Sequence, residues 1–125
     1  MRTAPAQCMS TDHRKLSAFT LADELTLRAY RATGGFPPSE RYGLQSQIRR
    51  TSVSIATNIV EGCALDSDRE HLRFFEMAFS STREVIYLID LAGRLEFIDS
   101  QAASDLCNFA GRVAAALAAL KKSIS

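Results

Sequence analysis

Arginine supplies most of the positive charge in this 125-residue sequence, with twelve of the fifteen basic side chains. Its planar guanidinium carries five donors that match carboxylate and phosphate groups. Arg28 and Arg94 each follow an acidic residue by four positions, so local ion pairs on a helix account for them. Of the other cations with no opposite charge three or four residues away, six are candidates for phosphate contacts or for ion pairs between subunits: Arg31, Arg49, Arg50, Arg112, Lys121 and Lys122.

A stripe of polar side chains recurs at helical spacing in the middle of the chain. At about 100° per residue, the stripe lies directly beside an apolar one, so we expect its members to be half or fully buried. The stripe consists of Gln47, Arg50, Ser54, Asn58 and Glu61. Because buried polar groups must be hydrogen-bonded, it could be a network that fixes helix register or subunit packing. Alternatively, it could line a binding surface for RNA or for a partner protein.

Residues for acid–base, nucleophilic or metal chemistry are scarce. The two histidines are His13 and His71, and the motifs of zinc proteases, serine hydrolases and nucleotide-binding loops do not occur. His71 and Glu76 could share a metal ion only if they lay on one face of a helix, and their spacing puts them on different faces. We therefore expect His71 to be a surface residue at a helix start. Cys63 has no histidine close behind it to activate the thiol. The sequence therefore predicts a protein that is not an enzyme and that binds no cofactor and no metal.

Cysteine usage and hydropathy favour a cytoplasmic protein. The three cysteines, Cys8, Cys63 and Cys107, follow no CxxC or CxxH spacing, so they indicate neither a disulfide framework nor a zinc site. The longest apolar run, residues 113–120, is far shorter than the roughly 20 residues that cross a bilayer. Residues 1–15 lack the apolar segment of a secretory signal, and we expect them to form a disordered arm.

Apolar residues recur every three or four positions along most of the chain, and strand signals are nearly absent. Two glycines at 34–35 end the first periodic segment, and Ser39 is a candidate N-cap for the second, which we expect to stop at Gly62. Ser67 and Glu70 fit the capping box that begins a third helix. The predicted helices cover residues of about 16–33, 40–61, 68–95 and 100–121. Because short connections favour antiparallel neighbours, we predict an all-α domain over residues 16–125, an antiparallel up-down-up-down four-helix bundle.

Two of the predicted helices carry more apolar surface than one bundle face can bury. In the second helix, an apolar stripe that includes Ile55 would face the core, yet the opposite side carries Val53, Ala56 and Val60. The third helix is apolar over a wide arc made of two adjacent stripes. We therefore predict self-association, with these three residues of the second helix in contact between subunits.

The central segment resembles a known protein family. The resemblance rests on Phe36-Pro37, Glu40, Tyr42-Gly43-Leu44, Gln47-Ile48-Arg49-Arg50, Ser52-Val53-Ser54-Ile55, Asn58-Ile59 and Glu61-Gly62, followed by Arg73-Phe74, Ala78, Ser80-Ser81 and Glu84. These residues are similar to the signature of the four-helix bundle proteins called 23S rRNA intervening-sequence proteins. The resemblance covers about residues 19–97 and implies a bundle that assembles as a ring-like homopentamer.

The same resemblance implies an association with nucleic acid. Some members of that family are encoded within insertions in large-subunit ribosomal RNA genes. A related branch comprises accessory proteins of diversity-generating retroelements, which are basic pentamers that bind a reverse transcriptase and nucleic acid. Two functions remain open: an oligomeric accessory protein that binds structured RNA or a reverse-transcriptase-like partner, or an oligomeric scaffold that binds proteins without nucleic acid.

Overall fold

The computed structural model describes residues 12–13 and 16–124, and every long element in this part of the chain is a helix. The elements are α2 (Ser17–Thr33), the short 3₁₀ helix η2 (Pro38–Glu40), α3 (Leu44–Cys63), α4 (Asp68–Arg94) and α5 (Ser100–Ile124). No strand occurs among the described residues, so the predicted all-α fold with four helices is confirmed. The predicted arm of residues 1–15 lies outside the described residues, apart from residues 12–13.

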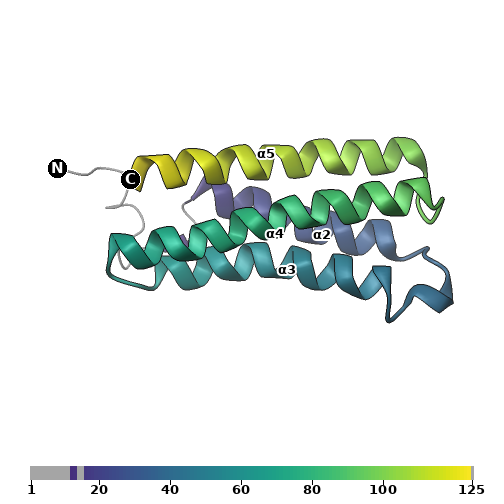
Figure 1. Cartoon of the computed structure of the whole chain (residues 1–125), viewed down its shortest axis with the longest axis horizontal. Helices are drawn as coiled ribbons and strands as arrows, with labels where there is room; N and C mark the ends of the chain where they lie inside the picture. The colour runs from purple at the N-terminus through teal and green to yellow at the C-terminus, as the bar shows by residue number, and fades with distance from the viewer. Residues whose placement is uncertain (1–11, 14–15, 125) are drawn as a thin grey trace.

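The four long helices lie along one common axis and alternate in direction (Figure 1). α2 packs against α3 and α5, and α4 packs against the same two helices, so each helix has two neighbours. One end of the bundle holds the α2–α3 and α4–α5 connections, and the other end holds the α3–α4 connection and the last residues of α5 (Figure 1). None of the described helices is both long and apolar enough to cross a membrane.

One apolar stripe from each helix forms the core. Leu25 of α2, Ile55 of α3, Phe75 of α4 and Val113 of α5 are fully buried. The stripe of α3 that we expect to face the core is buried at each of its positions: Leu44, Ile48, Thr51, Ile55, Ile59 and Gly62. Full burial of one large apolar side chain contributes about 1.5–3 kcal/mol. Core packing therefore stabilises these helices more than their intrinsic propensity does.

The first turn of α3 differs from the prediction, because the helix begins at Leu44 rather than at residue 40. The two prolines at 37–38 lead the chain into η2, and Ser39 is not the N-cap. Instead, the carboxylate of Glu40 accepts the backbone N–H of Leu44 at 2.9 Å, which also suits the positive end of the helix dipole. A Cβ on Gly43 would lie 2.7 Å from Oε1 of Glu40, so the glycine leaves room for this cap.

Side-chain caps define the starts of α4 and α5. The hydroxyl of Ser67 accepts the backbone N–H of Glu70 at 3.1 Å, as the capping-box pattern predicts. At α5, the carboxylate of Asp99 accepts the N–H groups of Gln101 at 3.1 Å and Ala102 at 3.2 Å. Both caps satisfy donors that have no partner inside the helix.

The wide apolar arc of α4 is largely buried inside the bundle. Phe75, Val85 and Ile89 are fully buried, while Phe79 and Ile86 are partly buried against the core. α4 contacts both α3 and α5, so its two apolar stripes serve two helix contacts within one chain. The buried part of this arc therefore needs no second subunit to cover it.

Gly62 lies inside α3 and does not end the helix, contrary to the prediction. α3 continues to Cys63, and Gly62 is buried. A Cβ on residue 62 would lie 2.9 Å from the ring of Phe75 and 3.1 Å from Cβ of Phe74. This glycine therefore permits a close approach between α3 and α4.

We predict opposite effects for two glycine-to-alanine substitutions in helices. Gly62→Ala should lower the free energy of unfolding by about 1–3 kcal/mol, because the added methyl group overpacks the contact with Phe75. Gly111→Ala in α5 should raise it by about 0.5–1 kcal/mol, since alanine favours a helix and the new methyl group meets no atom within 4 Å. Urea unfolding followed by circular dichroism measures both. Equal stabilisation by the two substitutions would contradict the close contact at Gly62.

Candidate nucleic-acid interface

The six candidate cations lie in three separate parts of the bundle. Arg31 is in the last turn of α2, and residues 49–50 are near the start of α3, so these three share the end with the α2–α3 connection. Arg112 lies midway along α5, while residues 121–122 are in its last turn at the opposite end. The structure therefore brings three of the six together and separates the rest.

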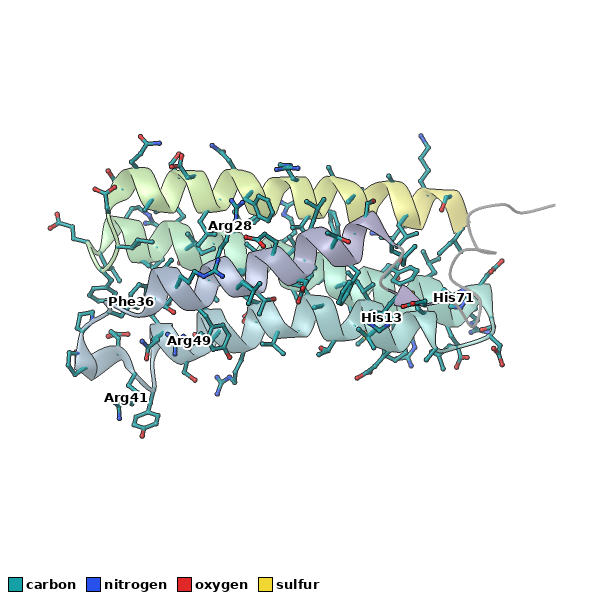
Figure 2. All side chains as sticks on the ribbon, turned by 180° about the vertical axis from the view of Figure 1, so that it is seen from behind. His13, Arg28, Phe36, Arg41, Arg49 and His71 are labelled. Carbon is teal, nitrogen blue, oxygen red and sulfur yellow. The ribbon has the colours of Figure 1, made fainter. Side chains whose placement is uncertain are left out.

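Arg49 is bound to the carboxyl end of α2. Its Nε donates to the hydroxyl of Thr33 at 2.8 Å, and its Nη2 donates to the carbonyl of Tyr30 at 3.1 Å. The guanidinium also lies 4.6 Å from the centre of the Tyr30 ring. Figure 2 shows Arg49 at the end of the bundle where α2 leads into α3. Because its donors bind groups of α2, Arg49 joins two helices and is a weaker candidate for phosphate than its spacing predicts.

Two other candidates lie over aromatic rings of the bundle. The guanidinium of Arg112 is 5.1 Å from the centre of the Phe109 ring, and Nζ of Lys121 is 4.3 Å from that of Phe79. Such cation–π contacts contribute about 0.5–1 kcal/mol at exposed sites. The side chains of the remaining candidates are exposed and make no hydrogen bond or ring contact within the described chain: Arg31, Arg50 and Lys122.

The turn before α3 adds a cation that is missing from the predicted set. Arg41 is exposed and points away from the bundle (Figure 2). It has no opposite charge three or four residues away, so the same rule selects it. Residues 25–60 contain five arginines and one carboxylate, Glu40, which caps α3. The exposed cations of this region are called the arginine end below and are Arg31, Arg41 and Arg50.

The polar stripe of α3 is divided into a hydrogen-bonded part and an exposed part. The hydroxyl of Ser54 lies 3.0 Å from that of Ser81 on α4, and Nδ2 of Asn58 donates to the carbonyl of Ser54 at 2.8 Å and to its hydroxyl at 3.2 Å. The other members of the stripe are exposed and lie outside this network: Gln47, Arg50 and Glu61. The expectation that the whole stripe is buried is therefore wrong, and only its half-buried part joins α3 to α4.

A shallow depression of about 450 Å³ lies between α3 and α4 beside this network. Its lining includes Ser54 and Asn58 together with Arg73 and Glu76 of α4. The one cation and the one carboxylate offset each other, so the depression has little net attraction for a phosphate. The arginine end is therefore the better candidate for an anionic ligand.

Exposed apolar side chains of α2 and α3 lie side by side along the bundle. The hydroxyl of Thr26 donates to the carbonyl of Ser52 at 3.2 Å, so α2 and α3 are in contact next to Leu27 and Val53. These two side chains are 46% and 37% exposed. The surface is called the α2–α3 apolar face below and consists of the exposed Leu27, Tyr30 and Val53 with the half-buried Ala56 and Val60. It includes all three residues that the sequence predicts to contact another subunit. Ala56 packs partly against the core, so it does not lie on the opposite side of the helix as the sequence predicts.

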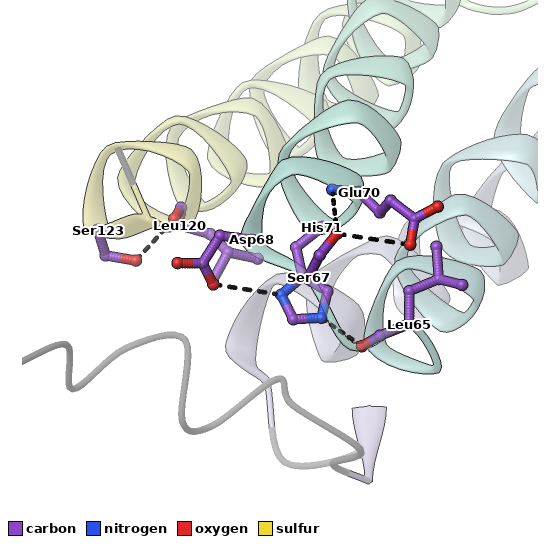
Figure 3. Close-up of polar contacts among 7 residues, drawn as sticks. All are labelled: Leu65, Ser67, Asp68, Glu70, His71, Leu120 and Ser123. Atoms are coloured by element: carbon purple, nitrogen blue, oxygen red, sulfur yellow. Dashed lines mark hydrogen bonds and ion pairs between the residues drawn. The ribbon is translucent and has the colours of Figure 1, made fainter.

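His71 is buried and is not the surface residue that the sequence predicts. Its side chain is fully enclosed, and Nε2 lies 2.5 Å from the carbonyl oxygen of Leu65 (Figure 3). Nδ1 lies 3.9 Å from Oδ1 of Asp68. The ring thus holds the α3–α4 connection against the first turn of α4. Among the residues that the structure describes, no cluster of His, Cys, Asp and Glu could hold a metal ion.

The thiol of Cys107 lines a cleft of about 350 Å³ between α4 and α5. The thiol donates to the carbonyl of Ile86 at 3.5 Å. Burial raises the pKa of the Cys107 thiol, and the carboxylate of Asp90 raises it further. Since the thiolate is the nucleophile, this environment lowers the reactivity of the sulfur.

Comparison with known proteins identifies a family. The model of the family described as 23S rRNA-intervening sequence protein matches residues 14–119. Among solved structures, the chain is similar to a protein of unknown function from the S23 ribosomal protein family of Bacteroides thetaiotaomicron. The TM-score is 0.75 at 20% sequence identity, covering 84% of this chain and 98% of that chain, which shows a shared fold. No curated protein matches the chain.

We predict that two members of the polar stripe respond differently to truncation. Asn58→Ala should lower the free energy of unfolding by about 1–2 kcal/mol, because two hydrogen bonds to Ser54 are lost. Glu61→Ala, at an exposed position, should change it by less than about 0.5 kcal/mol. Thermal unfolding of both variants tests the division of the stripe, and equal losses would contradict it.

Proposed function

The chain belongs to the 23S rRNA-intervening sequence protein family, and on this basis we propose that it is a non-enzymatic, homo-oligomeric protein that binds RNA. We propose the arginine end as the surface that contacts the RNA. The observation that carries this proposal is the position of three exposed arginines, Arg31, Arg41 and Arg50, at the end of the bundle that holds the α2–α3 connection.

Phosphate binding needs cations whose donors are not already used inside the protein. Arg31, Arg41 and Arg50 meet this condition, because each is exposed and its guanidinium makes no hydrogen bond within the described chain. A guanidinium can bind two phosphate oxygens at once, which makes arginine well suited to a nucleic-acid backbone. Glu40, whose carboxylate accepts the N–H of Leu44, offsets only one of these three positive charges.

Self-association would place several arginine ends on one particle and so increase its affinity for RNA. Three phosphate contacts give one subunit only weak, salt-dependent affinity. Several subunits on one RNA raise the overall affinity through a high effective concentration. The α2–α3 apolar face is the proposed contact between subunits, and the family resemblance favours a homopentamer. The arginine end and the apolar face belong to the same two helices, so one particle would present several arginine ends.

The reactive side chains support a binding role more than a catalytic one. His71 is enclosed with Nε2 against a backbone carbonyl, and burial raises the pKa of the Cys107 thiol. We propose that the protein acts in the cytoplasm on structured RNA, alone or with a reverse-transcriptase-like partner. The alternative is an oligomeric scaffold that uses the α2–α3 apolar face for protein partners and binds no nucleic acid.

We predict that the protein binds a structured RNA hairpin with a steep dependence on salt. Arg31→Ala, Arg41→Ala and Arg50→Ala should each weaken binding and lower the slope of log Kd against log salt by about one, because one phosphate contact is lost. Arg83→Ala is the matched control, since it removes an exposed arginine from α4. Fluorescence anisotropy at several salt concentrations measures both quantities.

Two results would overturn this prediction. If the wild-type protein binds no hairpin RNA at low salt, the RNA-binding proposal fails and the scaffold alternative takes its place. If Arg83→Ala weakens binding as much as the other three substitutions, the RNA contacts the protein diffusely and the arginine end is not its site.

We predict an oligomer that is held together by the α2–α3 apolar face, with a mass of about 70 kDa for a ring of five copies. Val53→Asp should dissociate it into subunits of 13.7 kDa, because the charge would be buried without a partner. The subunit should still fold, since Val53 is 37% exposed within one chain. Met77→Asp, at a residue of α4 that is 39% exposed, is the control and should leave the mass unchanged. A wild-type monomer in light scattering at micromolar concentration would contradict the proposal.

A further inference from the structure

The turn around Tyr42 is held in one conformation by backbone hydrogen bonds. The N–H of Arg41 donates to the carbonyl of Pro38 at 3.2 Å, and the N–H of Gly43 donates to the carbonyl of Glu40 at 3.1 Å. The side chain of Glu40 also caps α3, and two prolines precede the turn. A side chain on such a turn is presented to a ligand with little further loss of backbone entropy.

The side chain of Tyr42 is almost fully exposed to solvent. Its exposed fraction is 89%, whereas the next most exposed large apolar side chain of the described residues, Tyr87, is 57% exposed. The nearby ring of Phe36 is 7% exposed and belongs to the core. The ring of Tyr42 therefore contributes little to folding and is accessible to a ligand.

We infer that Tyr42 is a stacking platform for an unpaired base of the bound RNA. The inference rests on the proposed function and narrows the ligand to RNA with unpaired nucleotides, such as a hairpin loop. A tyrosine ring stacks on any base, because every base has a flat π-face. Arg41, which precedes Tyr42 in the same turn, is then placed to bind a phosphate next to the stacked nucleotide.

Because stacking on Tyr42 needs an unpaired base, we expect the protein to bind RNA loops more tightly than RNA duplexes. In an A-form duplex the faces of the bases are stacked on one another, and proteins contact mainly the backbone and the 2′-hydroxyl groups. In a loop, bases can be splayed out and stacked on aromatic side chains. A duplex would therefore use the arginines alone, while a loop would use the arginines and Tyr42.

The surroundings of Tyr42 favour RNA over a protein partner. Tyr42 has an arginine before it and a glycine after it, and the only carboxylate in residues 25–60 is used as a helix cap. RNA fits both features, because its flat bases can stack on the ring of Tyr42 and its phosphates can bind the arginines.

The test uses the full-length protein, an RNA hairpin with 2-aminopurine in its loop, and a blunt duplex of the same stem. Tyr42→Ala should weaken binding of the hairpin about 5- to 150-fold, the equivalent of ~1–3 kcal/mol for one stacked base. It should leave the affinity for the duplex and the salt slope unchanged, because no phosphate contact is lost. The 2-aminopurine fluorescence should change on binding of the wild-type protein and much less with the variant.

Two control variants accompany this measurement. Tyr42→Phe keeps the ring and should bind the hairpin as the wild type does, and Tyr87→Ala removes an exposed tyrosine from α4 and should have no effect. If Tyr42→Ala binds the hairpin normally while the arginine variants do not, stacking is wrong and the proposed function stands. If Tyr42→Ala changes the oligomer mass and leaves RNA binding intact, Tyr42 contacts protein and the inference is wrong. If the wild type binds neither RNA at low salt, the proposed function fails and the inference fails with it.

Discussion

The contact between Arg49 and the carboxyl end of α2 is the interaction on which one end of the molecule depends. The guanidinium binds the hydroxyl of Thr33 and the carbonyl of Tyr30, while Nε2 of Gln45 donates to the carbonyl of Thr33 at 2.8 Å. The first turns of α3 are thus tied to the last turn of α2, whose negative end gains a cation. The connection of residues 34–43 links two helix ends that these hydrogen bonds hold together. In this connection Arg41 and Tyr42 are exposed to solvent.

The helices and the core could be predicted from apolar periodicity, because a stripe such as Ile48, Ile55 and Ile59 can face only one way on a helix. Two boundaries could not be predicted in this way. Glu40 caps α3 from four residues upstream, so the helix begins later than a cap at Ser39 would allow. The residue type of Gly62 suggests a helix end, but the structure shows a different reason for a glycine there. The Phe75 ring of α4 packs so closely that residue 62 has no room for a side chain.

The candidate site could be predicted only in part, because charge spacing describes contacts within one helix. That spacing does not show that Arg49 binds groups of α2, or that Arg112 lies over the ring of Phe109. It does select Arg41, which a count of charges over residues 25–60 would also have found. The role of Tyr42 depends on its 89% exposure, which residue type alone does not reveal.

The central claim is that RNA binds where α2 leads into α3, and ultraviolet cross-linking tests it most directly. A structured RNA with an unpaired loop is irradiated in complex with the protein, and trypsin then releases peptides that end at arginine or lysine. The account predicts the main RNA adduct on the peptide of residues 42–49, which begins with Tyr42. Adducts found mainly on peptides of α5, such as residues 113–121, would place the RNA elsewhere and contradict it.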